Sequence, residues 1–363
     1  MGKRPDPKIP ALIEAIAAIS ESRPAIQIME VCGTHTVSLF RSGVKSMLPE
    51  SLHLISGPGC PVCVTAQGYI DGACELARRP DVIIATYGDM VRVPGKDGSL
   101  ADFRGQGAVV QVVYSARDAV KLARQNPDKA VVFLAVGFET TAPTTAAVLL
   151  EAEASGLENF FVLPGHKLVV PAMMALLAGG DVPIDGFMCP GHVSVIIGAQ
   201  AYAPVAREHG KPCVVTGFEP AQMLEGILAI LKQIEAEKAE VENVYRVAVS
   251  DRGNPVAMQM VDRVFEPGDA VWRALGTIPG SGLILRGEYE KFNAARKYEL
   301  DTETDYEAPG CRCGEVIQGK LSPPDCALFG KVCTPIKPVG PCMVSSEGAC
   351  AAWYKYGRNV ARS

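Results

Sequence analysis

The stretch AVVFLAVGFETTAPTTAAVLLEAEAS, residues 130–155, decides the fold class. It opens with a continuous apolar run that is rich in β-branched side chains and ends at Gly137. A polar turn follows, and then a segment whose composition fits a helix. A wholly apolar strand that leads directly into a helix is typical of a parallel sheet with helices packed on its faces. The stretch therefore predicts an α/β protein.

The same alternation continues in both directions from this stretch. Short apolar runs at 26–31, 52–56, 81–88 and 108–114 precede it, and further strands at 160–165, 184–191 and 212–220 follow it, with helical segments between them. GFE occurs after a strand both at 137–139 and at 217–219, which suggests two related halves. We expect two Rossmann-like α/β domains with parallel sheets, domain I at 1–140 and domain II at 141–243.

Composition excludes several classes of function. The 363 residues carry a formal net charge of −5, and their charges are scattered, so nucleic acid is not an expected partner. No segment reaches the roughly 18 consecutive apolar residues of a membrane span, and no membrane association is expected. The N-terminal residues lack the features of a secretory signal, so we expect a cytoplasmic protein.

The C-terminal region, residues 244–363, changes character and becomes rich in glycine, proline and cysteine from residue 308 onward. Half of the twelve cysteines of the chain lie in this part, namely Cys311, Cys313, Cys326, Cys333, Cys342 and Cys350. Soft thiolates that converge from loops are the ligands of iron–sulfur clusters, and we expect a small iron–sulfur domain here. A zinc site or plain thiols are the alternatives, although the CxxC knuckles typical of zinc are absent from this part.

Two earlier motifs each follow a strand and precede a helix. GPGCPVC at 57–63 places Cys60 and Cys63 as a CxxC pair, and CGTH at 32–35 places Cys32 beside His35. A cysteine at a helix N-terminus is expected to favour the thiolate, which suits redox chemistry or metal binding. The alternative for GPGCPVC is a pair of inert buried thiols beside a turn, and the alternative for CGTH is a cysteine and a histidine that are merely structural.

Two polar loops stand at the ends of later strands. GFETTAP contains Glu139, Thr140 and Thr141, and CPGHVSV contains His192. Ligands of open α/β sheets bind at this edge, so these side chains are candidates to line a cleft. Helix capping by threonine and a packing histidine are the alternatives. Cys74 is expected to be a small buried hydrophobe.

Six motifs in this order resemble the HypD family of hydrogenase maturation proteins over nearly the whole chain: CGTH, GPGCPVC, GFETTAP, PGHVSVI, TGFEP and the final cysteine block. In that family the cluster cysteines are separated by twelve, six and sixteen residues. The resemblance implies that Cys313, Cys326, Cys333 and Cys350 hold a 4Fe-4S cluster. Cys311 and Cys342 are left over as a nearby redox pair or as free thiols.

The resemblance also implies a function. Family members are scaffolds and redox proteins for assembly of the Fe(CN)2(CO) group of nickel–iron hydrogenases, acting with the partner HypC and receiving cyanide through HypE. Carried over, Cys32, Cys60 and Cys63 would hold the mononuclear iron in transit, and His35 would assist them. These four are the expected catalytic residues of a maturation factor with redox activity rather than a free-standing enzyme. The alternative is a 4Fe-4S-dependent thiol–disulfide reductase that acts through Cys60 and Cys63.

Overall fold

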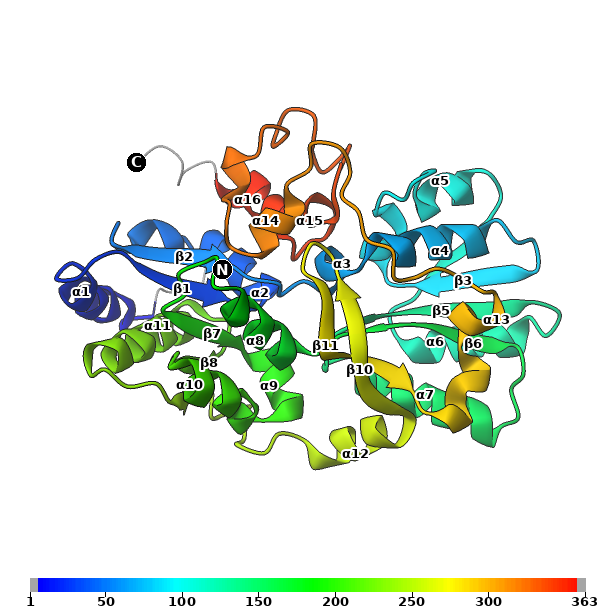
Figure 1. The fold of residues 1–363 in the computed structure, drawn as a ribbon, viewed down its shortest axis with the longest axis horizontal. Helices are drawn as coiled ribbons and strands as arrows, with labels where there is room; N and C mark the ends of the chain where they lie inside the picture. The colour runs from blue at the N-terminus through cyan, green and yellow to red at the C-terminus, as the bar shows by residue number, and fades with distance from the viewer. Residues whose placement is uncertain (1–5, 358–363) are drawn as a thin grey trace.

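The computed structural model describes residues 6–357 and has the predicted α/β architecture. Two parallel sheets lie side by side, and the cysteine-rich segment (residues 308–357) lies over the region between them (Figure 1). No helix of residues 6–357 is both long enough and apolar enough to cross a membrane.

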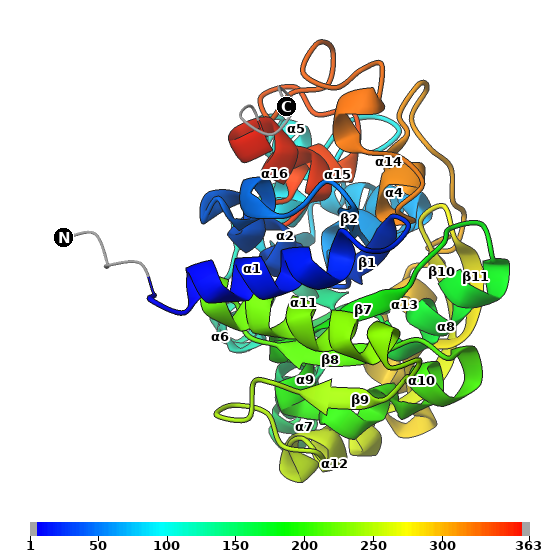
Figure 2. The same cartoon turned by 90° about the vertical axis from the view of Figure 1, so that its left-hand side faces the viewer.

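One sheet has five strands in the order β2-β1-β7-β8-β9. Its strands are β1 (Ile26–Glu30), β2 (Leu52–Ser56), β7 (Gly186–Pro190), β8 (Cys213–Thr216) and β9 (Val241–Asn243). Helices α1 (Ile9–Ser20) and α11 (Pro220–Glu235) pack against each other over one face of this sheet (Figure 2). Their apolar side chains meet those of the strands in one buried cluster that includes Ile16, Ile28 and Ile227.

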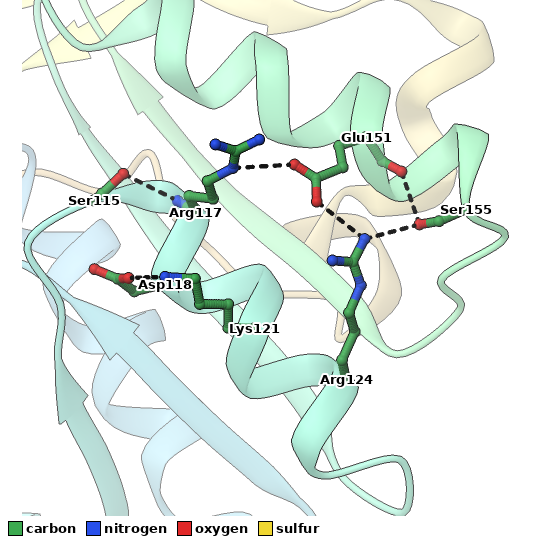
Figure 3. Close-up of polar contacts among 7 residues, drawn as sticks. All are labelled: Ser115, Arg117, Asp118, Lys121, Arg124, Glu151 and Ser155. Atoms are coloured by element: carbon green, nitrogen blue, oxygen red, sulfur yellow. Dashed lines mark hydrogen bonds and ion pairs between the residues drawn. The ribbon is translucent and has the colours of Figure 1, made fainter.

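The other sheet has four strands in the order β4-β3-β5-β6. Its strands are β3 (Val82–Thr86), β4 (Val109–Val112), β5 (Ala130–Gly137) and β6 (Phe160–His166), and its helices are α4 (Gln67–Ala77), α5 (Leu100–Gly105), α6 (Ala116–Gln125) and α7 (Ala142–Ala154). Strand β5 is buried at almost every position, which explains why its sequence is uniformly apolar. Helices α6 and α7 are also joined on the surface, where Glu151 pairs with Arg124 at 3.0 Å and with Arg117 at 3.5 Å (Figure 3).

The predicted domain boundary at residue 140 does not coincide with the division between the sheets. Residues 26–56 and 186–243 build the five-stranded sheet together, and residues 82–166 build the other sheet. Strand β1 pairs in parallel with β7, with Ile28 opposite Gly186, so the four-stranded sheet is an insertion between β2 and β7. Alternation of strands and helices predicts parallel sheets, but it does not say which strands become neighbours.

The remaining helices before residue 264 are short connections. They are α2 (Gly33–Arg41), η1 (Val44–Met47), α3 (Pro61–Val64), η2 (Gly88–Arg92), α8 (Val169–Gly179), α9 (Gly191–Ile197), η3 (Ala199–Tyr202), α10 (Ala203–His209) and α12 (Pro255–Val264). An antiparallel hairpin of β10 (Phe265–Trp272) and β11 (Gly276–Leu285) follows, and then η4 (Gly287–Phe292) and α13 (Ala294–Lys297).

The cysteine-rich segment has only short helices, as its composition predicts. They are α14 (Cys313–Ile317), η5 (Pro323–Asp325), α15 (Pro341–Val344) and α16 (Ala349–Tyr356). Helix α16 packs on α2 (Gly33–Arg41), where the rings of Trp353 and Phe40 meet edge to face at 4.8 Å. The C-terminal segment is thereby held against the loop that carries CGTH.

Candidate functional site

The CGTH and GPGCPVC loops contact each other at the carboxyl ends of β1 and β2. Cys32 directly precedes α2, and the N–H of Gly33 donates to the carbonyl of Gly59 at 3.2 Å. A Cβ atom on Gly59 would lie 2.4 Å from the nitrogen and 2.5 Å from the Cα of Cys32. Only glycine allows so close an approach of two backbones. The convergence of the two loops, expected because parallel strands end at one edge, is confirmed.

Aromatic rings and a buried imidazole form the next part of the site. The Nε2 atom of His35 lies 3.0 Å from the carbonyl oxygen of Gly217 and 2.9 Å from Oγ1 of Thr216. Because a carbonyl only accepts, this nitrogen carries the proton, and the buried Nδ1 is the lone-pair nitrogen. Nδ1 has no hydrogen-bond partner among the described residues. The ring of Phe218 stacks with the rings of both His35 and His192, with centroid distances of 4.6 Å and 3.9 Å.

Glu347 brings a carboxylate to this site from the cysteine-rich segment. Oγ1 of Thr34, in the CGTH loop, donates to Oε1 of Glu347 at 2.7 Å. Gly33 lies so near that an added Cβ would be 2.1 Å from the carbonyl oxygen of Glu347. Sequence reasoning missed Glu347 because it belongs to no strand-end loop. The glycine of CGTH was the available signal that another backbone approaches there.

Burial controls the ionisation of the CGTH residues. Loss of solvation raises the pKa of Cys32 to about 11, and the charge of Glu347 adds to the increase. Burial also lowers the pKa of His35 to about 4. At neutral pH the site therefore holds a thiol and a neutral imidazole. The expectation that the helix N-terminus keeps Cys32 as thiolate is wrong, because desolvation outweighs it, and a metal bound there must displace a proton.

The CxxC pair lies in the short helix α3 (Pro61–Val64) and immediately before it. Cys60 is 5% exposed and Cys63 is 1% exposed, and the N–H of Cys63 donates to Sγ of Cys60 at 3.3 Å. Burial raises the pKa of Cys63 well above its ordinary value, so this group is also a thiol at neutral pH. Helix α15, which carries Cys342, packs against α3, and the thiols of Cys63 and Cys342 lie close enough to affect each other's pKa.

All six cysteines of the cysteine-rich segment line one small cavity. They are Cys311, Cys313, Cys326, Cys333, Cys342 and Cys350. The cavity is otherwise mostly apolar, with Val316, Leu328, Phe329 and Met343 in its wall. Within it Cys313 lies close enough to Cys311 and Cys342, and Cys342 close enough to Cys350, for these thiols to affect one another's pKa.

The donor set of this cavity fits an iron–sulfur cluster. The four cysteines singled out by their spacing all reach it, and the N–H of Val339 donates to Sγ of Cys333 at 3.3 Å. Hydrogen bonds from backbone N–H groups to cysteine sulfur are among the features that tune such clusters. Burial raises the pKa of Cys333, so a bound metal would have to hold its sulfur as thiolate.

A single metal ion has no comparable preformed site. Within residues 6–357, no three histidine, cysteine, aspartate or glutamate side chains form a group that could hold one ion. Joint ligation of iron by Cys32, Cys60 and Cys63 therefore stays a prediction, since the sulfur partners of Cys63 here are Cys60 and Cys342.

The other predicted loop residues are divided between two places. His192 lies beside the CGTH site, as described above, but Glu139 and Thr141 do not belong to that site. Oε1 of Glu139 accepts from the N–H of Val169 at the start of α8, and Thr141 lies 3.5 Å from Nδ1 of His166. The carboxylate of Glu139 thus accepts from the first N–H of α8, whereas Thr141, which directly precedes α7, makes no side-chain capping bond to that helix.

Comparison with known proteins places these motifs in a family. The family model described as "HypD: Hydrogenase formation hypA family" matches residues 8–357. The chain is 48% identical over 354 residues to the hydrogenase expression/formation protein HupD of Azotobacter chroococcum mcd 1, covering 96% of this chain and 93% of that protein. It is 47% identical over 332 residues to the hydrogenase maturation factor HypD of Escherichia coli (strain K12), covering 91% and 89%.

Proposed function

Since the chain belongs to the HypD family and its role is in hydrogenase maturation, we propose that it is the scaffold on which the Fe(CN)2(CO) group of a nickel–iron hydrogenase is assembled. HypC would be its partner in this work, and HypE would deliver the cyanide. The iron that carries these ligands is cargo, which passes through the site. The protein would then be a maturation factor with redox activity rather than a free-standing enzyme.

One observation carries the proposal: the CGTH site, the CxxC pair and the cysteine-lined cavity lie next to one another. Cys60 follows Gly59, which touches the backbone of Cys32. From Cys60 the contacts pass to Cys63, then to Cys342 and on to Cys313. Adjacent thiols exchange oxidation state by thiol–disulfide exchange. The arrangement joins a site suited to hold iron with a site suited to hold a redox cofactor.

The cavity cysteines would hold a 4Fe-4S cluster, which when bound supplies single electrons. Ligands are attached to iron at a defined oxidation state, and this requires an electron source. Cys342 contacts both the CxxC pair and the cavity cysteines, so we assign it the connecting role. Oxidation of the Cys60 and Cys63 thiols to a disulfide would release two electrons and two protons.

Cys32 is the residue that we assign to the iron. A thiol is a soft ligand that suits iron with cyanide and carbonyl ligands, and it loses its proton on binding. Nδ1 of His35 is buried and has no hydrogen-bond partner among the described residues, so it is free to accept a hydrogen bond from a group bound in the site. Phe218 helps to fix the orientation of this imidazole by stacking on it, and the ring of His192 also stacks on Phe218.

The reductase alternative has less support from the geometry. A thiol that attacks the disulfide of another protein must be accessible, but Cys60 and Cys63 are 5% and 1% exposed. Infrared spectroscopy separates the two functions. Protein purified anaerobically with HypC and HypE should show cyanide and carbonyl stretching bands. Reduction of a protein disulfide by a chain that never shows these bands would instead establish the reductase.

A further inference from the structure

The loop at 331–337 exposes apolar side chains directly outside the cysteine-lined cavity. Ile336 is 96% exposed and Val332 is 54% exposed, while Cys333, which follows Val332, is buried and lines the cavity. The loop is ordered by hydrogen bonds: the N–H of Thr334 donates to the carbonyl of Lys337 at 3.1 Å. The exposed side chains of Val332 and Ile336 therefore lie on a hydrogen-bonded turn.

The charged side chains of the loop itself are of one sign. Residues 326–340 contain Lys331 and Lys337 and no acid, in a chain whose net charge is −5. Arg92 adjoins the loop, because its Nη1 atom donates to the carbonyl of Pro335 at 3.3 Å. None of these three cations forms an ion pair within the described part of the chain. We call the exposed side chains of Lys331, Val332, Ile336 and Lys337 the 331–337 surface.

We propose that the 331–337 surface docks a small, acidic one-electron carrier protein. This inference rests on the proposed function, in which the cavity cysteines hold an electron-accepting cluster. Small apolar contacts with a charged rim of one sign are suited to transient redox encounters, which bury less area than stable complexes. An acidic partner would pair with Lys331 and Lys337 and cover Ile336.

The position of the surface favours an electron carrier over a partner that delivers iron ligands. Val332 is the sequence neighbour of Cys333, so a carrier seated here is separated from the cavity by the wall of one loop. The CGTH site instead contacts the segment around Glu347. In the docked complex one electron would pass from the carrier, which would be oxidised by one electron, to the cluster that the cavity cysteines would hold. No bond forms or breaks.

The test uses reduced plant-type 2Fe-2S ferredoxin, a strongly acidic carrier, as the probe and the anaerobically purified whole chain as the acceptor. Stopped-flow absorption gives the second-order rate constant for electron transfer at several salt concentrations. The double variant Lys331→Glu/Lys337→Glu should lower this constant at least about tenfold at low salt, and the constant should no longer fall as salt is added, because attraction has been replaced by repulsion. Ile336→Ser should lower it at all salt concentrations, because the lost contact is apolar.

Matched controls lie on a distant part of the molecule. Lys238→Glu and Val247→Ser change an exposed cation and an 88% exposed valine on either side of β9, the strand at the far edge of the five-stranded sheet. Both should react with ferredoxin as the wild type does. Dithionite, a small reductant that needs no docking surface, should reduce all variants at one rate.

Two results distinguish failure of this inference from failure of the proposed function. Rate constants that are equal in the wild type and in both 331–337 variants would overturn the docking surface while leaving the cluster intact. A wild type that holds no cluster would overturn the proposed function. In that case the ferredoxin NMR shifts on titration with the chain would still report docking, and their persistence in the lysine double variant would refute the surface independently.

Discussion

Replacing Gly33 by alanine tests whether the cysteine-rich segment is seated on the CGTH loop. The added Cβ would lie 2.1 Å from the carbonyl oxygen of Glu347 and 2.7 Å from its Cβ, so α2 and this turn must move apart. Overpacking of this kind costs about 1–3 kcal/mol. Alanine in place of glycine at an unobstructed helix position instead gains about 0.5–1 kcal/mol. We expect a net loss of roughly 1–2 kcal/mol in the free energy of unfolding.

Urea denaturation followed by far-UV circular dichroism measures this loss. Gly179, the last residue of α8, is the matched control, because a Cβ there would meet nothing within 4 Å. Gly179→Ala should be as stable as the wild type or more stable by up to about 1 kcal/mol. If Gly33→Ala proves as stable as Gly179→Ala, the close contact with Glu347 does not exist in solution.

Three further substitutions address the cavity, the buried histidine and the thiol contacts. Anaerobically purified wild type should be brown from its 4Fe-4S cluster, and Cys326→Ser should lose this colour and have a looser cysteine-rich segment, because metal binding there supplies folding free energy. A colourless, zinc-loaded, folded wild type would contradict this. Burial lowers the pKa of His166 from 6.5 to about 4, so its neutral form stabilises the fold above pH 6.5 and up to about 3 kcal/mol is lost as the pH falls toward 4. In His166→Gln the free energy of unfolding should depend less on pH between 6.5 and 4. An unchanged pH dependence would show that His166 is not the group that titrates there. Cys342→Ser should retain the cluster absorption, but electrons should no longer pass between the cluster and the Cys60–Cys63 pair. Differential alkylation and mass spectrometry would measure the oxidation state of this pair. If the pair is reduced as in the wild type, Cys342 does not connect it to the cluster.

The fold class was predictable because its signals are local. The apolar run that became β5 and the helical segment that became α7 lie within residues 130–155, and each reports its own burial. The domain division was wrong because it depends on strand pairing. Strand β7 pairs with β1, which lies more than 150 residues earlier in the chain. Nothing in the sequence of either short apolar run indicates that the other will be its neighbour in the sheet.

For the candidate site too, the features with a local sequence pattern were predictable and those that depend on distant segments were not. The meeting of the CGTH and GPGCPVC loops follows from the rule that parallel strands open at one edge, and the sequence predicted it. The contribution of Glu347 and the contact of Cys63 with Cys342 arise from docking of a distant segment, which has no local pattern. The protonation of Cys32 was misjudged because the burial that raises its pKa is a property of the assembled fold.

The most direct test of the scaffold function is the infrared spectrum of Cys32→Ala purified anaerobically with HypC and HypE. Cys74→Ala is the control, because this cysteine is 4% exposed and its Sγ lies 3.5 Å from the carbonyl oxygen of Gly98, in another part of the fold. Cys32→Ala should lose the cyanide and carbonyl bands while the cluster absorption persists, and Cys74→Ala should keep both signals. If Cys32→Ala shows the full set of bands and still matures hydrogenase, Cys32 does not hold the iron.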